Sequence, residues 1–231
     1  MEILNPRVFI VIPAFNESSI IGQVIQSLKK NGYENILVVN DGSSDNTHKI
    51  ASENGAEVLS HIINRGQGAA LRTGIEYLRA NYDPDIIVTF DADGQHSHED
   101  IPKLISPIIE EDIDITLGSR FLTNKADTNI PPLRRLVLKA GVLFTNITSN
   151  IKLTDTHNGL RALNRRAINS IRLTHRGMEH ASEIIEEIAK KKLKYKEVPV
   201  QIIYSKYSSQ KGQKTSSFIK LGIKILIKKI I

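Results

Sequence analysis

The sequence predicts an α/β fold in which a mostly parallel sheet carries helices on both faces. Short apolar runs rich in β-branched residues recur through the first half of the chain, and polar or turn residues bound them, as is typical of buried strands. A segment with helical periodicity separates each run from the next. Strands and helices that alternate in this way form parallel sheets covered on both sides.

The expected elements follow from these patterns in chain order. Strands are expected at residues 8–12, 36–39, 58–59, 86–90 and 113–117, and helices at 18–30, 45–54, 67–80 and 98–110. In the less regular second half, helices are expected at 133–149, 165–170 and 178–192, a polar loop at 154–159 and a strand at 196–204. Residues 205–217 are rich in Ser, Gly, Gln and Lys, which predicts an irregular segment.

The length of 231 residues is enough for one large domain, expected at residues 1–205. A basic extension is expected to follow it at residues 206–231. The absence of cysteine excludes a disulfide scaffold, a thiolate zinc site and a cysteine nucleophile. Residues 1–13 lack the basic segment and long apolar run of a signal peptide, so a cytoplasmic protein is expected. Aromatic residues are scarce, at 5% of the chain, which argues against base-stacking platforms and against a nucleic-acid partner.

Positive charge is concentrated at the C-terminal end of the sequence. Residues 190–231 hold twelve lysines and one acidic residue, which gives +11; because the whole chain is +6, the preceding residues sum to −5. Within residues 216–231, Lys220, Lys224 and Lys228 fall on one helical stripe and apolar residues cover the rest, which predicts an amphipathic helix. It is too short and too often interrupted to span a bilayer. The expected helix would either bind an anionic membrane surface or pack on the domain, and the pattern fits both alternatives equally well.

Ligands of parallel sheets bind at the carboxyl ends of the strands, so the residues there are the candidates for function. After the first strand, Pro13 is expected to stop the strand and Asn16 to cap the next helix. After the second strand, Asp41 suits either a turn or the ribose or base of a nucleotide. The glycines Gly66 and Gly68 begin the third expected helix, where free backbone N–H groups bind phosphate.

The most informative pair is Asp91 and Asp93, at the end of an otherwise apolar strand. Residues two apart in a strand project to the same side, so the two carboxylates are expected to lie together and to need a counter-charge. A hard divalent cation, Mg²⁺ or Mn²⁺, shared with substrate phosphates supplies it. Arg120, Arg134 and Arg161 offer planar cations suited to phosphate, although surface solvation explains many arginines equally well.

Six segments, taken together and in order, resemble the family 2 glycosyltransferases of GT-A fold, most closely the dolichyl- or polyprenyl-phosphate sugar transferases. They are P-A-F-N-E at 13–17, N-D-G-S-S-D-N-T at 40–47, N-R-G-Q-G-A-A at 64–70, D-A-D-G-Q at 91–95, G-S-R-F at 118–121 and D-T-H-N-G-L-R-A at 155–162.

The resemblance implies a role for each matching residue. The nucleotide sugar would be bound by Pro13, Ala14, Asn16, Glu17, Asp41, Ser43, Gly68, Asp91 and Ala92. Asp91 and Asp93 would hold the metal, Gln95 would lie near the sugar, and Arg120, Arg134 and Arg161 would engage phosphates or the acceptor. Asn40 stands where many relatives have a first aspartate, and His157 stands where a small residue is common, as either a loop residue or a metal ligand.

The acidic residues of the second half of the chain bear on the acceptor. Relatives that glycosylate hydroxyls usually carry a Glu-Asp pair, as general base, on the helix corresponding to residues 178–192. That pair is missing here, although Glu179 or Glu183 remains available. A lipid phosphate is already anionic at pH 7 and needs cationic guidance more than a base.

The leading hypothesis is therefore metal-dependent, inverting transfer of a hexose or N-acetylhexosamine from a nucleotide sugar, UDP-linked rather than GDP-linked, to an undecaprenyl-type phosphate for cell-surface glycan assembly. The enzyme would work at the cytoplasmic face of the membrane, recruited by its tail or by a small membrane partner protein. The alternatives are transfer to a hydroxyl of a glycan or lipid-linked oligosaccharide, and a non-catalytic basic adaptor with a vestigial acidic motif.

Overall fold

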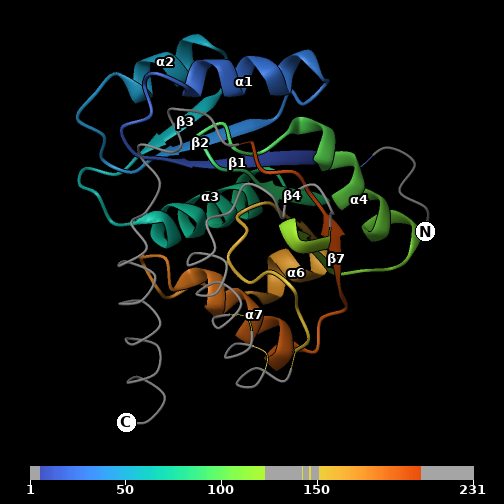
Figure 1. The fold of residues 1–231 in the computed structure, drawn as a ribbon. Coiled ribbons are helices and arrows are strands. Elements are labelled where there is room, and N and C mark those ends of the chain that lie inside the picture. The colour runs from blue at the N-terminus through green and yellow to red at the C-terminus, as the bar shows by residue number, and fades with distance from the viewer. Residues whose placement is uncertain (1–5, 123–141, 143–145, 147–150, 204–231) are drawn as a thin grey trace.

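The fold is a single mixed sheet between two layers of helices (Figure 1). A computed structural model describes residues 6–122, 142, 146 and 151–203. Within these residues, seven strands pair in the order β3-β2-β1-β4-β6-β5-β7. The strands are β1 (Val8–Ala14), β2 (Ile36–Asn40), β3 (Glu57–Ser60), β4 (Ile86–Thr89), β5 (Ile115–Ser119), β6 (Arg161–Asn164) and β7 (Tyr195–Pro199). Only β6 runs antiparallel to its neighbours β4 and β5.

Each face of the sheet has its own hydrophobic core, because successive side chains of a strand point to opposite sides. In β1, Ile10 and Ile12 pack with α1 (Ile21–Lys30), α2 (Thr47–Glu53) and α4 (Ile101–Glu110). Phe9 and Val11 of the same strand pack with α3 (Gln67–Asn81), α6 (Arg165–Ser170) and α7 (His180–Lys191). The expectation of helices on both faces is therefore confirmed, and Figure 1 shows α1 and α2 on one side of the sheet and α3, α6 and α7 on the other.

The strand β6 is the main element that the sequence analysis missed. Its residues fell between the polar loop expected at 154–159 and the helix expected at 165–170 and were assigned to no element, because Arg161 interrupts the apolar pattern of a buried strand. In the structure this arginine pairs in register with Thr89 of β4 and is only 3% exposed. The strand is central, so its buried charge lies directly behind the residues that follow β4.

Several boundaries also differ from expectation. β1 continues through Pro13 to Ala14, whose carbonyl accepts a hydrogen bond from the Asp41 N–H (2.8 Å). Asn16 does not cap α1, which begins five residues later at Ile21. The last strand ends at Pro199 instead of 204, because the chain then crosses to the far side of the site: Ile203 N donates to Gln95 O (2.9 Å).

Some expectations lie outside the described residues. They are the helices at 133–149 and 216–231, the irregular segment 205–217, the boundary between a domain and an extension at 205–206, Arg134, and the membrane-binding lysines Lys220, Lys224 and Lys228. Among the helices that the structure describes, none is long and apolar enough to cross a bilayer.

Asp45 fastens together two turns that carry site residues. Its carboxylate accepts hydrogen bonds from Ser18 N (3.1 Å) after β1 and from Thr47 N (3.0 Å) at the start of α2. Burial opposes ionisation of Asp45, but the hydrogen bonds from Thr47 and Ser18 outweigh it and lower its pKa to about 2. The folded state therefore favours the carboxylate, and its stabilisation is complete above pH 4 and is lost as the pH falls toward 2.

We expect Asp45→Ala to lower the free energy of unfolding by about 1 kcal/mol at pH 7, a value reduced for the solvent exposure of the side chain. Because protonation removes the same interactions from the wild type, the difference between the two proteins should shrink at pH 2. Urea denaturation at the two pH values measures it. A difference that does not depend on pH would contradict this role of the carboxylate.

Candidate active site

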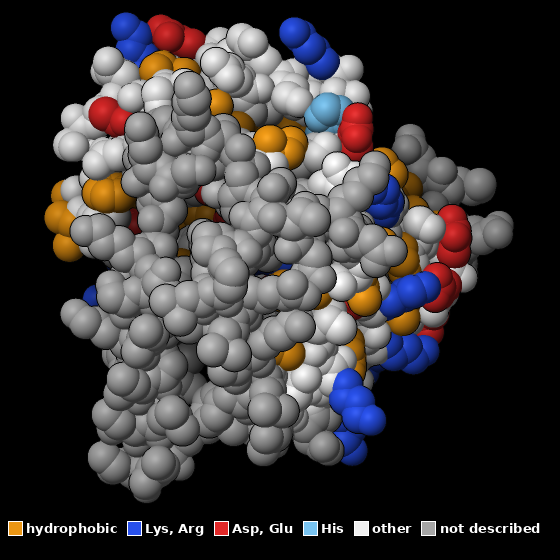
Figure 2. All heavy atoms as spheres, viewed as in Figure 1, with side chains coloured by type: hydrophobic (Ala, Val, Ile, Leu, Met, Phe, Trp, Pro, Cys, Tyr) orange, Lys and Arg blue, Asp and Glu red, His pale blue; other side chains and the backbone are white. Residues whose placement is uncertain are grey.

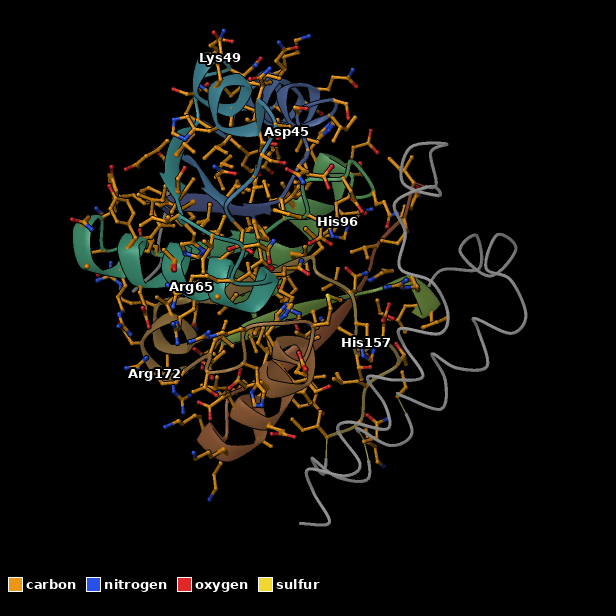
Figure 3. All side chains as sticks on the ribbon, turned by 90° about the vertical axis from the view of Figure 1, so that its left-hand side faces the viewer. Asp45, Lys49, Arg65, His96, His157 and Arg172 are labelled. Carbon is orange, nitrogen blue, oxygen red and sulfur yellow. The ribbon has the colours of Figure 1, made fainter. Side chains whose placement is uncertain are left out.

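A cavity of about 600 Å³ opens at the carboxyl ends of the parallel strands. Figure 3 looks onto this edge of the sheet, with Arg65, His96 and His157 labelled around it. Its walls come from the segments after β1, β2, β3, β4, β5 and β7 and from the loops that precede β6 and α7. The order of the strands reverses at β1, between β2 and β4, which is the usual place for a ligand in an open α/β sheet.

Nine of the predicted site residues line this cavity: Pro13, Ala14, Glu17, Asp41, Asp91, Ala92, Asp93, Gln95 and Arg120. Asn16, Ser43, Gly68 and Arg161 do not line it. Gly66, which was expected to offer its N–H group to phosphate, also lines the cavity. The lining further contains residues that were not predicted to belong to the site: Phe15, Asn64, Gln67, Ala70, His96, Gly159, Gly177, Met178 and Ile202. Residues scattered through the sequence are thus brought to one edge of the sheet.

Asn16 and Ser43 connect the two turns beside the cavity. Asn16 N donates to Ser43 Oγ (2.9 Å), and the side-chain oxygen of Asn16 accepts from Ser44 N (2.9 Å). Asn16 has a positive φ of 55°, a conformation that asparagine tolerates better than most residues. The two residues therefore shape the wall formed by Pro13 and Ala14 and stand behind it.

Asp41 is buried, and its carboxylate organises the loop after β3. One oxygen accepts from His61 Nδ1 (2.6 Å) and Arg65 N (2.9 Å), and the other accepts from Gly66 N (2.7 Å). Asn40 does not line the cavity, since its side chain bonds to Ser60 Oγ and to Ser43 N. Its side chain therefore bears on the packing of β2 and β3 and does not touch the cavity directly.

The glycines at the start of α3 serve close packing. Gly66 N–H is held by Asp41, and Ala69 N–H donates to Arg176 O (3.1 Å). At Gly68, an added Cβ would lie 2.3 Å from His175 O and 2.8 Å from His180 Cβ. The Gly66 amide, which was expected to bind phosphate, is thus engaged within the protein, as is the neighbouring amide of Ala69. Gly68 lets the segment before α7 lie against α3.

We expect Gly68→Ala to destabilise the protein by about 1–3 kcal/mol, because the methyl group would overlap backbone atoms that have little room to move. Gly22→Ala is the matched control, since that helical glycine faces the flexible side chains of Asn54 and Ile50. Thermal unfolding compares the two. Equal stability of both variants would contradict the packing role of Gly68.

Asp91 and Asp93 lie in the turn after β4 and not on the strand as expected, because β4 ends at Thr89 and the chain turns through Gly94 at φ 73°. Asp91 accepts hydrogen bonds from Gln67 Nε2 (3.0 Å) and His96 Nε2 (2.9 Å). Asp93 accepts one from Gln95 N (3.0 Å). Both carboxylates line the cavity.

The two carboxylates differ in their electrostatic environment. Burial opposes ionisation of Asp91, but the His96 hydrogen bond and the charge of nearby Arg161 outweigh it and lower its pKa. Burial and the negative charge of Asp91 raise the pKa of Asp93 to about 6. Asp93 therefore carries a negative charge that the protein itself compensates poorly, as the sequence analysis expected of a paired acid.

Arg161 supplies the counter-charge to Asp91 from beneath the cavity. Burial lowers the pKa of this guanidinium to about 10, although the charges of Asp91 and Asp155 oppose the shift, so it stays a cation at neutral pH. Burial lowers the pKa of His180, which lies in the same region, to about 4, so that imidazole is neutral. Arg161 acts behind the site and does not reach its surface.

His96 and Gln67 are functional candidates that the sequence analysis overlooked. His96 is 7% exposed, its ring lies edge-on to Phe90, and its Nδ1 is buried without a hydrogen-bond partner among the described residues. Both residues fix the orientation of Asp91. Gln67 lies within one of the six quoted segments and His96 directly follows another. These positions in the sequence could have identified both residues as candidates.

Arg120 and His157 form the wall near β5 and β6. The Arg120 Nε donates to Asp155 Oδ2 (2.6 Å), and Asp155 is almost fully buried. Arg120 is only 9% exposed, so simple surface solvation does not account for it. Burial lowers the pKa of His157, which leaves a neutral imidazole facing the cavity at pH 7.

The acidic residues of α7 do not reach the cavity. Glu183 accepts hydrogen bonds from Thr174 N (2.8 Å) and His175 N (3.0 Å), and Glu187 accepts from Arg172 N (3.2 Å). Neither they nor Glu179 lines the cavity. Glu183, considered above as a general base, instead holds the segment before α7 in place.

The carboxylates fit a divalent cation that is shared with a substrate. The described residues contain no cluster of three His, Cys, Asp or Glu side chains that would hold a metal by itself. Mg²⁺ and Mn²⁺ are commonly bound by one or two carboxylates together with phosphate oxygens, and that arrangement needs only Asp91 and Asp93. The excess negative charge at Asp93 is what such a cation would neutralise.

Comparison with known proteins identifies the family. Residues 9–172 match the family model described as glycosyl transferase family 2. An uncharacterised protein of Methanocaldococcus jannaschii is 40% identical, over 99% of this chain and 95% of that protein. A Methanococcus voltae protein named UDP-N-acetylglucosamine–dolichyl-phosphate N-acetylglucosaminyltransferase is 35% identical, over 96% of each chain.

Solved structures agree on the fold. Glucosyl-3-phosphoglycerate synthase from Mycobacterium tuberculosis, solved with Mn²⁺, uridine diphosphate and phosphoglyceric acid, superposes with a TM-score of 0.68 at 20% identity. The superposition covers 93% of this chain and 76% of that one. With the matching family model, the relatives and the GT-A-like architecture in agreement, the chain belongs to glycosyl transferase family 2 and is a glycosyltransferase.

Proposed function

We propose that this glycosyltransferase moves a hexose or N-acetylhexosamine from a UDP-linked donor to a polyprenyl phosphate, with inversion at the anomeric carbon and with Mg²⁺ or Mn²⁺ as cofactor. The name of the Methanococcus voltae relative makes UDP-N-acetylglucosamine and a dolichyl-type phosphate the first pair to test. A relative from Micrococcus luteus, 33% identical over 68% of this chain, is named undecaprenyl-phosphate mannosyltransferase. Both names support a lipid-phosphate acceptor.

The observation that carries the proposal is the distribution of carboxylates. Among the described residues that line the cavity, the acidic ones are Glu17, Asp41, Asp91 and Asp93. Asp41 is committed to the loop after β3, and the pair at 91 and 93 suits a cation. In α7, Glu183 and Glu187 bond to the segment at 172–175. A hydroxyl acceptor needs a base opposite the donor, whereas a phosphate with a second pKa near 6 is an anionic nucleophile at pH 7.

Each part of the cavity then has a task. The wall of Pro13, Ala14 and Glu17 and the loop held by Asp41 would bind the nucleoside, and Asp91 and Asp93 would hold the cation on the diphosphate. A bound Mg²⁺ or Mn²⁺ would neutralise charge on the departing diphosphate. Gln95 would contact the sugar or the cation. Arg120 would draw the acceptor phosphate toward the anomeric carbon, with its guanidinium oriented by Asp155.

The place of action is proposed to be the cytoplasmic face of a membrane, where polyprenyl phosphates reside. Lys220, Lys224 and Lys228 would contact anionic lipids, because basic residues near such a surface are attracted to it. A small membrane partner protein would be a second means of recruitment. Arg134 stays a predicted acceptor contact.

Transfer from radiolabelled UDP- and GDP-sugars into organic-extractable lipid tests the proposal. The purified full chain is incubated with undecaprenyl or dolichyl phosphate and with Mg²⁺, Mn²⁺ or a chelator. We expect label in the lipid phase with a UDP-sugar and a metal, and none with the chelator. Label transferred only to soluble glycans, or donor hydrolysis without lipid product, would contradict the lipid-phosphate acceptor while leaving the glycosyltransferase assignment intact.

A further inference from the structure

Large apolar side chains that are exposed to solvent gather at the edge of the sheet that bears the cavity. In the described part of the chain, such side chains follow the carboxyl ends of four parallel strands: Phe15 after β1, Ile62 and Ile63 after β3, Leu122 after β5, and Ile203 after β7. Two others, Tyr82 and Ile109, lie at the ends of α3 and α4, at the opposite edge. Figure 2 shows hydrophobic side chains along its left margin, at the height of the β3–α3 connection in Figure 1.

Ile62 and Ile63 are the most exposed of these residues, at 101% and 68%. Their exposure is not that of a loosely attached loop. His61 N donates to Asn40 O (2.9 Å) before them, and the Asp41 carboxylate accepts from Arg65 N and Gly66 N after them. The loop thus holds two adjacent isoleucines out of the protein, although water solvates them poorly.

The loop also packs closely on the turn after β2. An added Cβ at Gly42, which has φ 70°, would lie 2.4 Å from the Ile63 carbonyl carbon and 2.5 Å from Asn64 N. Only a glycine lets the two backbones approach this closely. The backbone contacts between this loop and the turn after β2 therefore determine the position of the isoleucines. Contacts of their own side chains do not.

The exposed pair stands beside the mouth of the cavity. Asn64, Gly66 and Gln67, immediately after the isoleucines, line the cavity, but the isoleucines themselves do not. The basic C-terminal segment leaves the described structure at the same mouth, since Ile202 lines the cavity and Ile203 N bonds to Gln95 O. Residues 204–231 contain seven lysines and no acidic residue.

We propose that Ile62 and Ile63 insert into the surface of an anionic phospholipid bilayer and so set the mouth of the cavity against the membrane. The proposal rests on the proposed function, because a polyprenyl phosphate presents its phosphate at that surface. Isoleucines supply apolar burial below the headgroups, and the lysines that follow residue 203 supply attraction to anionic headgroups, the two contributions that make interfacial binding stable. Together they would present the cavity to the acceptor at the membrane surface.

The test uses the double variant Ile62→Ser/Ile63→Ser in the full chain, with Ile109→Ser as the matched control. Ile109 is 43% exposed but lies at the opposite edge. Co-sedimentation with phosphatidylglycerol-containing vesicles and with phosphatidylcholine vesicles measures partitioning, in the absence of donor and acceptor. We expect the double variant to bind anionic vesicles at least about tenfold more weakly than the wild type, and the control to match the wild type. Binding of UDP with Mn²⁺, measured by calorimetry, should be the same in all three.

Unchanged partitioning of the double variant would overturn the proposal. So would a change from dimer to monomer in light scattering, which would make a second copy of the chain the occupant. A lower unfolding temperature of the double variant would also overturn it, since the pair would then be covered by the protein's own residues 204–231. Because the vesicle assay contains no substrate, loss of vesicle binding supports the proposal even if transfer to lipid phosphate fails.

Discussion

Replacing Asp93 by asparagine is expected to lower kcat/KM for sugar transfer by about 10³-fold or more. The substitution keeps the size of the side chain but removes the carboxylate charge that would hold a cation on the diphosphate, and such an interaction is worth several kcal/mol in the transition state. Because burial and Asp91 raise the pKa of Asp93 to about 6, this carboxylate is the less stabilised of the pair and the more available to a cation.

The same substitution should not harm the fold. A folded-state pKa above the ordinary value means that stability declines as the pH rises from 4 to 6, by on the order of 2 kcal/mol. In a chelating buffer, Asp93→Asn should lack this decline and be at least as stable as the wild type at pH 8. Mn²⁺ with UDP should raise the unfolding temperature of the wild type only.

Asp112→Asn is the control for Asp93→Asn. Asp112 is an exposed acid that pairs with Lys194 far from the cavity, so its substitution should change neither turnover nor the response to Mn²⁺. Near-normal transfer by Asp93→Asn would contradict the assignment of the metal site, and would favour a protein whose acidic motif has lost its function.

Replacing Arg161 by methionine is expected to destabilise the protein by about 3–5 kcal/mol. Arg161 is buried in the central strand β6, and its charge compensates those of Asp91 and Asp155. Removing one member of a buried group of charges leaves the others buried without compensation. The free-energy cost of that loss is larger than the net stabilisation that the complete group provides. The loss should be smaller at acid pH, where the carboxylates become protonated.

Arg165→Met is the matched control for this experiment. Arg165 follows four residues later and forms ion pairs with Asp83 (2.9 Å) and Asp85 (2.8 Å), but its side chain is 48% exposed. Exposed pairs contribute about 1 kcal/mol or less, so the control should unfold close to the wild type. Urea denaturation compares them, and similar losses in both variants would show that Arg161 has no special electrostatic role.

The sequence predicted the first half of the fold well because apolar runs and helical periods were clear there. α6 was expected at the residues where it occurs, and β4 and α3 were placed within one residue of their ends. β6 was missed because a charged residue in a pattern indicates solvent exposure, whereas Arg161 is buried against the charges of Asp91 in the turn after β4 and Asp155 in the loop before β6. Such compensation is a tertiary property that no local pattern contains.

The sequence predicted which residues form the site better than it predicted how they are arranged. Asp91 and Asp93 were expected to share a cavity, and they do, but from a turn and not from one face of a strand. Gly68 and Ser43 were grouped with the nucleotide because of their motifs, although the first packs against the residues before α7 and the second supports the wall formed by Pro13. Which motif residues face a cavity and which stand behind it depends on contacts between segments distant in sequence.

The proposed acceptor is a phosphate and not a hydroxyl. The direct measurement gives the enzyme two acceptors of the same chain length, a polyprenyl phosphate and the corresponding free polyprenol, with one radiolabelled UDP-sugar and Mn²⁺. We expect labelled product from the polyprenyl phosphate alone, linked through a phosphodiester that mild acid cleaves. Equal transfer to the polyprenol, or an acid-stable glycoside as the main product, would contradict it.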